Sequence, residues 1–310
     1  MIVFTYAGQG SQRVGMGADI YEEYKEYRDC VDNFSDLTGI TKLMKEGPIE
    51  ELTLTKNTQP AFALFAAGVT EVLKANGITP DAACGLSLGE YGALYASGVM
   101  NATDYVETVA YRGKVMQEAA EGLTCAMSAI LGLNAADVDK VVNNIDEGFV
   151  TVANYNCPGQ YVICGDEATV ALAEEKLKEA GAKRCLRLNV SGPFHTKYMQ
   201  PAADKLKMWL DEIKFSDPQI PVTMNVTGDV LSGKDVLVDL LEKQIRTSVH
   251  FEDDVNKLLE LGADTFVEIG PGKVLTGFVK KIAQAAGKEV KLYTIDKVDD
   301  LKNVIGELKK

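Results

Sequence analysis

The sequence is poor in histidine and tryptophan, and it lacks the patterns that mark several classes of protein. Its 310 residues include two histidines and one tryptophan, and no run of Lys and Arg offsets the formal net charge of −13. A surface for nucleic acid or for an anionic membrane is therefore not expected. No apolar run reaches the roughly eighteen residues of a transmembrane helix. The start, MIVFTYAGQG, has no basic signal-peptide segment, so we expect a cytoplasmic protein.

The cysteines do not form a C-x-x-C pair, which is the spacing typical of metal and redox sites. Four of the six lie in apolar, strand-like surroundings. Buried, reduced thiols are the simplest interpretation, and we expect no bound metal. The six are Cys30, Cys84, Cys125, Cys157, Cys164 and Cys185.

The apolar content is sufficient for one large core together with a smaller domain, because 46% of the residues are hydrophobic. In residues 1–123, short apolar runs such as residues 82–86 alternate with longer segments of helical periodicity. One helix is expected from about residue 102 to 121, with Asn101 or Thr103 as its cap. This alternation of strands and helices predicts a parallel α/β sheet.

Residues 124–190 have a different character. Their apolar segments follow the order strand, helix, strand, strand, helix, strand, which is the split βαβ pattern of a ferredoxin-like unit. After this stretch the chain returns to helices and to one more buried strand, residues 264–270. We therefore expect a small domain of residues 124–190 inserted in a large α/β core that residues 1–123 and 191–310 form together.

Residues 85–89, GLSLG, fit the nucleophile elbow G-x-S-x-G. The glycines of such a motif allow a sharp turn between strand and helix, which leaves the oxygen of Ser87 exposed. A serine at the start of a helix also meets unbonded N–H groups, which favour a developing oxyanion. The alternative is a simple glycine-rich turn, and the motif alone indicates only acyl chemistry on serine.

An activated serine needs a base within hydrogen-bond reach, and the sequence offers His195 and His250. His195 follows a Gly-Pro turn at the start of a helical segment, and His250 also precedes a helix. A histidine in a loop is more often a surface or capping residue than a catalytic base. Here, however, the sequence has two histidines in all, so each is a candidate for the base of Ser87. Spacing alone does not exclude either of them.

Arg112 lies on a mainly apolar helical stripe with Tyr105, Val109 and Met116. A buried charge without a partner is costly, so Arg112 needs either an internal carboxylate or an anionic ligand. The internal ion pair is the usual solution. Beside an acyl-serine, however, a guanidinium fork would hold a substrate carboxylate with two hydrogen bonds.

The loop AGQGSQ, residues 7–12, follows the first predicted strand. It is not a dinucleotide-binding loop, because the third glycine of that motif is replaced by Arg13. In elbow enzymes such a loop supplies the second N–H group of the oxyanion hole. The backbone of Gln9 is our candidate for this donor.

Taken together, these motifs resemble the malonyl-CoA:acyl-carrier-protein transacylases of fatty acid synthesis and the related acyltransferase domains of polyketide synthases. The resemblance spans almost the whole chain. It implies a hydrolase-like α/β core with a ferredoxin-like insert and substrate bound between the two. The motifs that carry it are GQGSQ, TQPA, GLSLGEY, RGKVMQ, NYNCPGQYVICG, VSGPFH, PAADKL and EIGPGKVLTG.

The resemblance also implies roles for individual residues. Ser87 is the expected nucleophile, His195 the general base and then the general acid, and Arg112 the clamp on the free malonyl carboxylate. In this family a main-chain carbonyl orients the histidine, and we assign that position to His250.

The remaining substrate-binding candidates surround these groups. The backbone N–H groups of Gln9 and Leu88 form the implied oxyanion hole. Phe194 and Leu88 resemble the malonyl-selective pattern, and Met116 lies on the same stripe as Arg112. Three features depart from the family pattern. Leu86 replaces the usual histidine before the nucleophile, Ala7 replaces a proline, and SGPFH replaces the commoner small or polar residues before the histidine.

The implied reaction moves a malonyl group from malonyl-CoA to the phosphopantetheine thiol of acyl carrier protein through malonyl-serine. No cofactor is expected to be bound, since coenzyme A enters and leaves as part of substrate and product. A serine thioesterase or hydrolase of the same elbow type, or a catalytically silent carrier-docking protein, are the alternatives. Carriers are acidic, so docking would need basic residues, for which the candidates are Lys183, Arg184, Arg187, Lys280 and Lys281.

Overall fold

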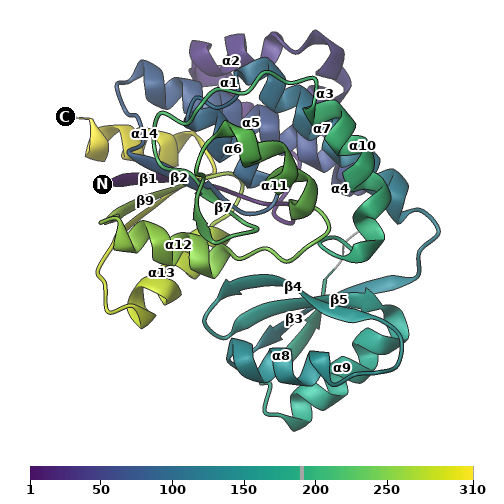
Figure 1. Ribbon diagram of the computed structural model, residues 1–310. Helices are drawn as coiled ribbons and strands as arrows, with labels where there is room; N and C mark the ends of the chain where they lie inside the picture. The colour runs from purple at the N-terminus through teal and green to yellow at the C-terminus, as the bar shows by residue number, and fades with distance from the viewer. Residues whose placement is uncertain (189–191, 310) are drawn as a thin grey trace.

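The computed structural model describes residues 1–188 and 192–309 and divides them into a larger and a smaller body (Figure 1). The larger body contains a four-stranded sheet of β1 (Ile2–Tyr6), β2 (Ala82–Gly85), β9 (Thr265–Ile269) and β10 (Lys291–Ile295). The strands lie in the order β10-β9-β1-β2, and every neighbouring pair is parallel. The predicted parallel α/β sheet is therefore confirmed.

Helices cover both faces of this sheet, as the alternation of side chains along β1 requires. Phe4 and Tyr6 belong to the same buried cluster as the long helices α5 (Thr55–Ala75) and α7 (Ala102–Ala120). Val3, which points to the opposite face, belongs to the cluster of helices α12 (Phe251–Glu260) and α13 (Val274–Ala285). Strands that are buried on both faces are mainly apolar, and β1 and β2 follow this pattern. The other helices here are α1 (Ala18–Glu23), α2 (Lys25–Asp32), α3 (Thr38–Glu46), α4 (Ile49–Thr53), α6 (Gly89–Ala96), α10 (Gln200–Leu210), α11 (Leu237–Gln244) and α14 (Val298–Leu308).

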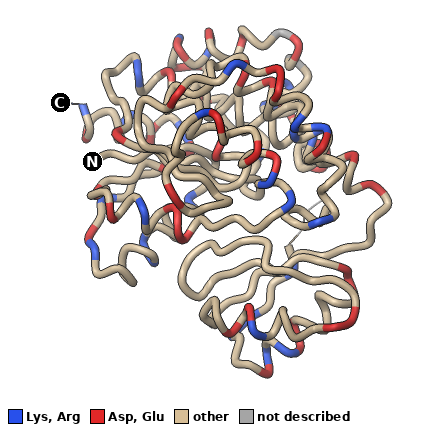
Figure 2. Tube along the Cα trace, in the orientation of Figure 1, with Lys and Arg blue, Asp and Glu red and all other residues tan. Residues whose placement is uncertain are grey.

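Helix α7 begins where the sequence predicts. The side chain of Asn101 accepts a hydrogen bond from the backbone N–H of Asp104, so Asn101 is the cap. Lys, Arg, Asp and Glu residues occur mainly in the outer helices and loops, and the strands of the central sheet contain few of them (Figure 2). This distribution agrees with a sheet that is covered on both faces.

The smaller body is a second sheet, which is antiparallel and lies below the larger body in Figure 1. Its strands lie in the order β4-β5-β3-β6, and α8 and α9 share a separate hydrophobic core with them. Along the chain the elements follow the predicted order of strand, helix, strand, strand, helix, strand. Their bounds are β3 (Cys125–Leu131), α8 (Ala135–Asn143), β4 (Val150–Cys157), β5 (Gln160–Asp166), α9 (Glu167–Glu179) and β6 (Arg184–Arg187).

The chain enters the smaller body at β3, close to the predicted boundary at residue 124. The predicted return between residues 190 and 191 lies outside the described residues, so the three-part division stays a prediction. A two-stranded hairpin of β7 (Thr223–Met224) and β8 (Asp229–Val230) lies in the second part of the larger body. Residue Val222, just before β7, forms a parallel bridge to Ala83 of β2, which brings this hairpin beside the elbow.

Three global features concern the described residues alone. In residues 1–188 and 192–309, no helix is long and apolar enough to cross a membrane. The six cysteines are free thiols. No group of three or more His, Cys, Asp and Glu side chains in that part of the chain is arranged to hold a metal ion.

Candidate active site

Ser87 lies at a sharp turn between β2 and α6, and its backbone is in the left-handed region with φ 55°. Non-glycine residues rarely adopt this conformation, which the surrounding structure must stabilise. The two glycines allow the close packing of the turn. A Cβ atom on Gly85 would lie 2.0 Å from the carbonyl carbon of Gly89, and one on Gly89 would lie 2.0 Å from Tyr6 O. This is the geometry of a nucleophile elbow and not of an ordinary glycine-rich turn.

The parallel sheet brings the loop after β1 to the elbow. Strands β1 and β2 are neighbours, so their carboxyl ends meet at the same edge of the sheet. The backbone N–H of Leu86 donates to Tyr6 O at 3.0 Å, which fixes the two ends together. Gln9 and Leu88 consequently line one cavity with Ser87. Leu88 is also the N-cap residue of α6, so its N–H lies at the positive end of the helix dipole.

His195 is the histidine that reaches the serine. Its Nε2 lies 2.8 Å from Ser87 Oγ, and its Nδ1 lies 2.7 Å from the main-chain oxygen of Gln244. A carbonyl oxygen only accepts, so Nδ1 carries the hydrogen and Nε2 is left to accept the serine proton. The backbone of His195 is also left-handed, with φ 60°, and its N–H donates to Ile245 O at 3.1 Å.

The electrostatic surroundings keep this imidazole neutral. Burial, reinforced by the positive charge of Arg112, lowers the pKa of His195 from its ordinary 6.5 to about 4. The Gln244 carbonyl opposes this shift, since it stabilises the protonated ring. At neutral pH the ring is therefore available as a base.

This shift predicts how acylation of the serine depends on pH. The rate is expected to stay level from neutral pH down to about pH 5 and to fall below it, because protonated imidazole cannot accept the serine proton. The midpoint of this fall in rate should lie near the lowered pKa of His195, which is about 4. Single-turnover acylation by malonyl-CoA across a pH series measures it, with circular dichroism at each pH as the control for folding. A midpoint near 6.5, the ordinary pKa of histidine, would contradict the assignment.

Arg112 completes the cluster and is fully buried. Its Nη1 donates to Gln59 Oε1 at 2.8 Å, and its Nη2 donates to Gln244 Oε1 at 2.9 Å and to Ser87 Oγ at 3.0 Å. All three acceptors are neutral oxygens. Of the two alternatives that the sequence left for Arg112, the internal carboxylate is therefore not its hydrogen-bond partner. The guanidinium carbon also lies 5.5 Å from the ring centroid of Tyr91. The charge is held in place but not neutralised.

The cavity above Ser87 has a volume of about 270 Å³ and lies between the two bodies of the molecule. The larger body contributes the loop after β1, the elbow and the start of α13, and the smaller body contributes residues of β3, β4 and β5. The side chain of Leu86, where the family pattern has histidine, is part of this wall. Six of the eight predicted site residues line the cavity, namely Gln9, Ser87, Leu88, Met116, Phe194 and His195.

The assignment of His250 was wrong. The carbonyl that holds His195 belongs to Gln244, six residues earlier, at the end of α11. The last carbonyls of a helix have no partner within the helix, so Gln244 can offer its own to the imidazole. The ring of His250 instead stacks on Tyr155, with centroids 4.9 Å apart, and its Nδ1 lies 3.3 Å from the Asp253 carboxylate.

Three buried amides of the site were missed from the sequence. Gln59 and Gln244 hold the guanidinium of Arg112, and Gln244 Nε2 also donates to Ser87 O at 2.7 Å. Asn225 Oδ1 accepts from the backbone N–H of Ser87 at 2.7 Å. Gln244 thus contacts the nucleophile, the base and the guanidinium. The available signal was a polar side chain on an apolar helical stripe, as at Gln244 after Leu237 and Leu241.

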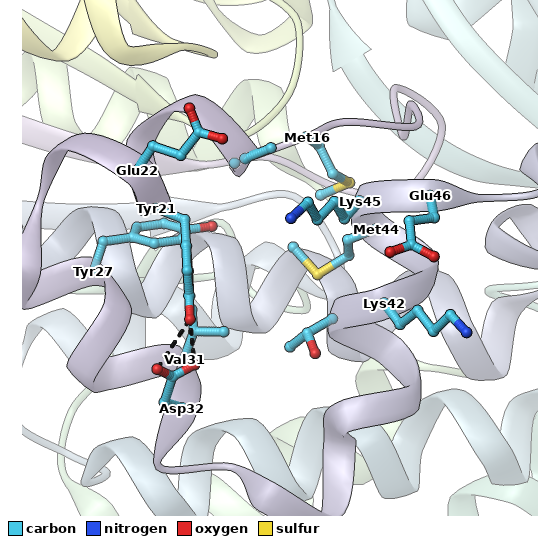
Figure 3. Close-up of a pocket in the computed structure, with 13 residues that line it drawn as sticks. Met16, Tyr21, Glu22, Tyr27, Val31, Asp32, Lys42, Met44, Lys45 and Glu46 are labelled. Atoms are coloured by element: carbon cyan, nitrogen blue, oxygen red, sulfur yellow. Dashed lines mark hydrogen bonds between the residues drawn. The ribbon is translucent and has the colours of Figure 1, made fainter.

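A second hollow, of about 230 Å³, lies between α1, α2 and α3 and is lined by none of the predicted site residues (Figure 3). Met16, Val31 and Met44 supply apolar walls, and the hydroxyl of Tyr27 is buried without a hydrogen-bond partner in the described part of the chain. Tyr21 is engaged by Asp32, to which its hydroxyl donates. This hollow has no histidine, serine or arginine in its lining, so it does not compete with the cavity above Ser87.

Comparisons with known proteins show the family of this chain. The model of the acyl transferase domain family matches residues 3–304. The malonyl CoA-acyl carrier protein transacylase of Bacillus subtilis is 46% identical over 285 residues, which is 91% of this chain and 90% of that protein. The transacylase of the same name from Escherichia coli K12 is 41% identical over 283 residues, covering 90% and 92%.

Solved structures give the same result. The MCAT of Streptococcus pneumoniae has a TM-score of 0.93 at 38% identity and covers 99% of this chain and 100% of its own. A malonyl-transacylase in complex with a type II PKS acyl-carrier protein has a TM-score of 0.93 at 35% identity and covers 99% of each chain. The chain therefore belongs to the acyl transferase family. Within that family its place is among the malonyl CoA-acyl carrier protein transacylases.

Proposed function

We propose that this chain transfers the malonyl group of malonyl-CoA to the phosphopantetheine thiol of an acyl carrier protein, with malonyl-Ser87 as the intermediate. One observation carries the proposal. The oxygen of Ser87 lies 2.8 Å from His195 Nε2 and 3.0 Å from Arg112 Nη2, so a base and a fixed cation meet at one hydroxyl. The names of the relatives agree with this substrate and this carrier.

In the first half-reaction His195 Nε2 accepts the proton of Ser87 as the serine oxygen attacks the thioester carbonyl. The backbone N–H groups of Gln9 and Leu88 are the proposed donors to the oxyanion. When the tetrahedral species collapses, the carbon–sulfur bond breaks and His195 returns the proton to the coenzyme A thiolate. The second half-reaction runs in reverse, with the carrier thiol as nucleophile and Ser87 as leaving group.

Arg112 is the proposed recognition group for the free carboxylate of the malonyl unit. Gln59 and Gln244 hold the guanidinium with neutral oxygens, so its full charge remains available to a bound anion. An acetyl group offers no such anion and would leave the charge unpaired. The side chains of Met116 and Phe194 also line the cavity, and a bulky ring there disfavours an α-methyl branch by about 1–3 kcal/mol.

The finer architecture is part of the same proposal. We take the larger body to be hydrolase-like, because its elbow serine directly follows β2, a strand of the parallel sheet that leads into helix α6. The smaller body, with its order β4-β5-β3-β6 and two helices, fits the ferredoxin-like pattern. No resident cofactor is proposed, because coenzyme A arrives and departs with the acyl group. The cytoplasmic location stays a prediction.

The carrier would approach along α13, whose first turns line the cavity with Leu275 and Phe278. Lys280 and Lys281 are exposed on the same helix and are the preferred docking residues. Arg187, another candidate from the sequence, is less suitable because Glu167 and Glu174 already pair with it.

The test is a transfer assay with malonyl-CoA and a holo acyl carrier protein, in which malonyl-carrier and free malonate are both quantified. The proposal predicts malonyl-carrier as the main product, and little malonate when the carrier is omitted. Release of malonate at the same rate with and without carrier would identify a hydrolase instead. A protein that gains no malonyl group from malonyl-CoA would be a silent docking protein.

A further inference from the structure

We propose that Asn225 is a positioning residue for the nucleophile, because its one side-chain amide holds two neighbouring backbone groups of the elbow, the carbonyl of Gly85 and the N–H of Ser87. This inference rests on the proposed function of Ser87. Asn225 follows directly after β7, is fully buried and does not line the substrate cavity. It acts on the serine through the backbone and not on the substrate.

The amide joins two parts of the chain that are far apart in sequence. Asn225 Oδ1 accepts from the backbone N–H of Ser87 at 2.7 Å, and Asn225 Nδ2 donates to Gly85 O at 2.8 Å. The same Nδ2 donates to Asp254 Oδ2 at 2.7 Å. An amide has an acceptor and two donors on one group, and these contacts use all three. A carboxylate at this position would lack the two donors, and an apolar side chain would lack the donors and the acceptor.

This grip matters because the serine is in an unfavourable conformation. A non-glycine residue at φ 55° is in a strained backbone conformation, which persists where its surroundings hold it. Asn225 binds the N–H of Ser87, and Gln244 Nε2 binds its carbonyl at 2.7 Å. With both adjoining peptide groups fixed, Ser87 Oγ stays between His195 and Arg112.

Two buried acids hold Asn225 itself. Its backbone N–H donates to the Glu90 carboxyl group, its side chain donates to Asp254, and its carbonyl accepts from the His250 N–H at 2.8 Å. Burial raises the pKa of Asp254 to about 8 and raises that of Glu90 well above its ordinary value, so burial favours the protonated form of both acids. Both acids accept hydrogen bonds from Asn225. Through these bonds, helices α6 and α12 are linked to the elbow.

The test measures Ser87 directly in the full chain. The Asn225→Ala variant is expected to lower the single-turnover rate of acylation by malonyl-CoA about 100-fold, because a misplacement near 1 Å costs that much. The KM for malonyl-CoA should change little, since Asn225 lies outside the cavity lining. The matched control is Asn134→Ala, which removes the cap of α8 far from the elbow. It reports what a loss of stability alone does to activity.

A second variant covers the case in which Asn225→Ala does not fold. Asn225→Asp keeps the size, and its protonated form restores one acceptor and one donor. Its rate relative to the parent should therefore rise as the pH falls from 8 to about 6, whereas a loss of packing alone gives no such recovery. Glu90 and Asp254 face the new carboxyl group and favour its neutral form.

Failure of this inference is separable from failure of the proposed function. Reaction of Ser87 with a serine-directed sulfonyl fluoride reports its position without malonyl-CoA or carrier. Folded variants that react with the reagent and with malonyl-CoA within a few-fold of the parent would overturn the role of Asn225. A parent protein that reacts with the sulfonyl fluoride but not with malonyl-CoA would overturn the proposed substrate. The positioning role of Asn225 would still be tested in that case, by comparing the rates at which the parent and the variants react with the sulfonyl fluoride.

Discussion

Replacing Ser87 with alanine is expected to abolish the malonyl-enzyme and with it transfer to the carrier. The hydroxyl is the atom that His195 and Arg112 share, and alanine leaves both without the group on which they act. Loss of a serine nucleophile in comparable enzymes lowers turnover on the order of 10⁴–10⁶-fold. Intact-mass measurement after incubation with malonyl-CoA detects the adduct in the parent, and peptide mapping places it.

The matched control for this prediction is Ser97→Ala. Ser97 is also buried, but its hydroxyl donates to Leu94 O at the end of α6, away from the cavity. This variant should form the adduct as the parent does. An adduct that persists in Ser87→Ala would show that another group, such as one of the free thiols, carries the malonyl unit.

Replacing Arg112 with alanine is expected to remove the preference for malonyl over acetyl groups. Truncating one partner of a buried charged pair costs about 2–5 kcal/mol, so malonyl transfer should fall roughly 30- to 5000-fold. Acetyl transfer should fall far less, because acetyl has no carboxylate to lose. Competition between malonyl-CoA and acetyl-CoA, read from the masses of the acyl-enzymes, measures the change.

Two further variants sharpen this test. Arg112→Lys keeps the charge but not the planar fork, and is expected to recover only part of the selectivity. Arg13→Ala removes a surface arginine that pairs with Asp296, and should leave selectivity unchanged.

Loss of the Arg112 charge should also raise the pKa of His195, so the acid limb of the pH profile for acylation should move toward neutral pH. Unchanged malonyl preference in Arg112→Ala would refute the clamp.

Much of the fold could be predicted because its signals are local. Buried strands such as β1 are mainly apolar, and the amphipathic helix α7 carries its own cap at Asn101. The order of elements in the smaller body could be followed directly along the sequence. The elbow was also visible, since its two glycines stand at fixed positions around Ser87.

The orienting carbonyl was misplaced because a main-chain oxygen has no side-chain signature. Gln244 and His250 both lie near helix ends, and nothing in their identities shows which carbonyl faces His195. The structure selects Gln244 because α11 ends with its free carbonyls directed at the imidazole.

The supporting amides could not be predicted for a different reason. Gln59 and Asn225 are visible as polar residues in apolar surroundings, but their partners lie far along the chain. Asn225 and Ser87 are 138 positions apart, and Gln59 and Arg112 are 53 apart. Such contacts depend on how the parallel strands and their crossovers pack, which no short window of sequence contains.

The central sheet also orders events during synthesis. Strand β1 pairs with β2 early in the chain and with β9 close to its end. When only the first half of the polypeptide has been synthesised, Ser87 is present but its base is not. His195, Asn225 and Gln244 all lie in the second half. A chain that ends before His195 therefore has the elbow serine without its base, and we expect such a product not to form an acyl-serine.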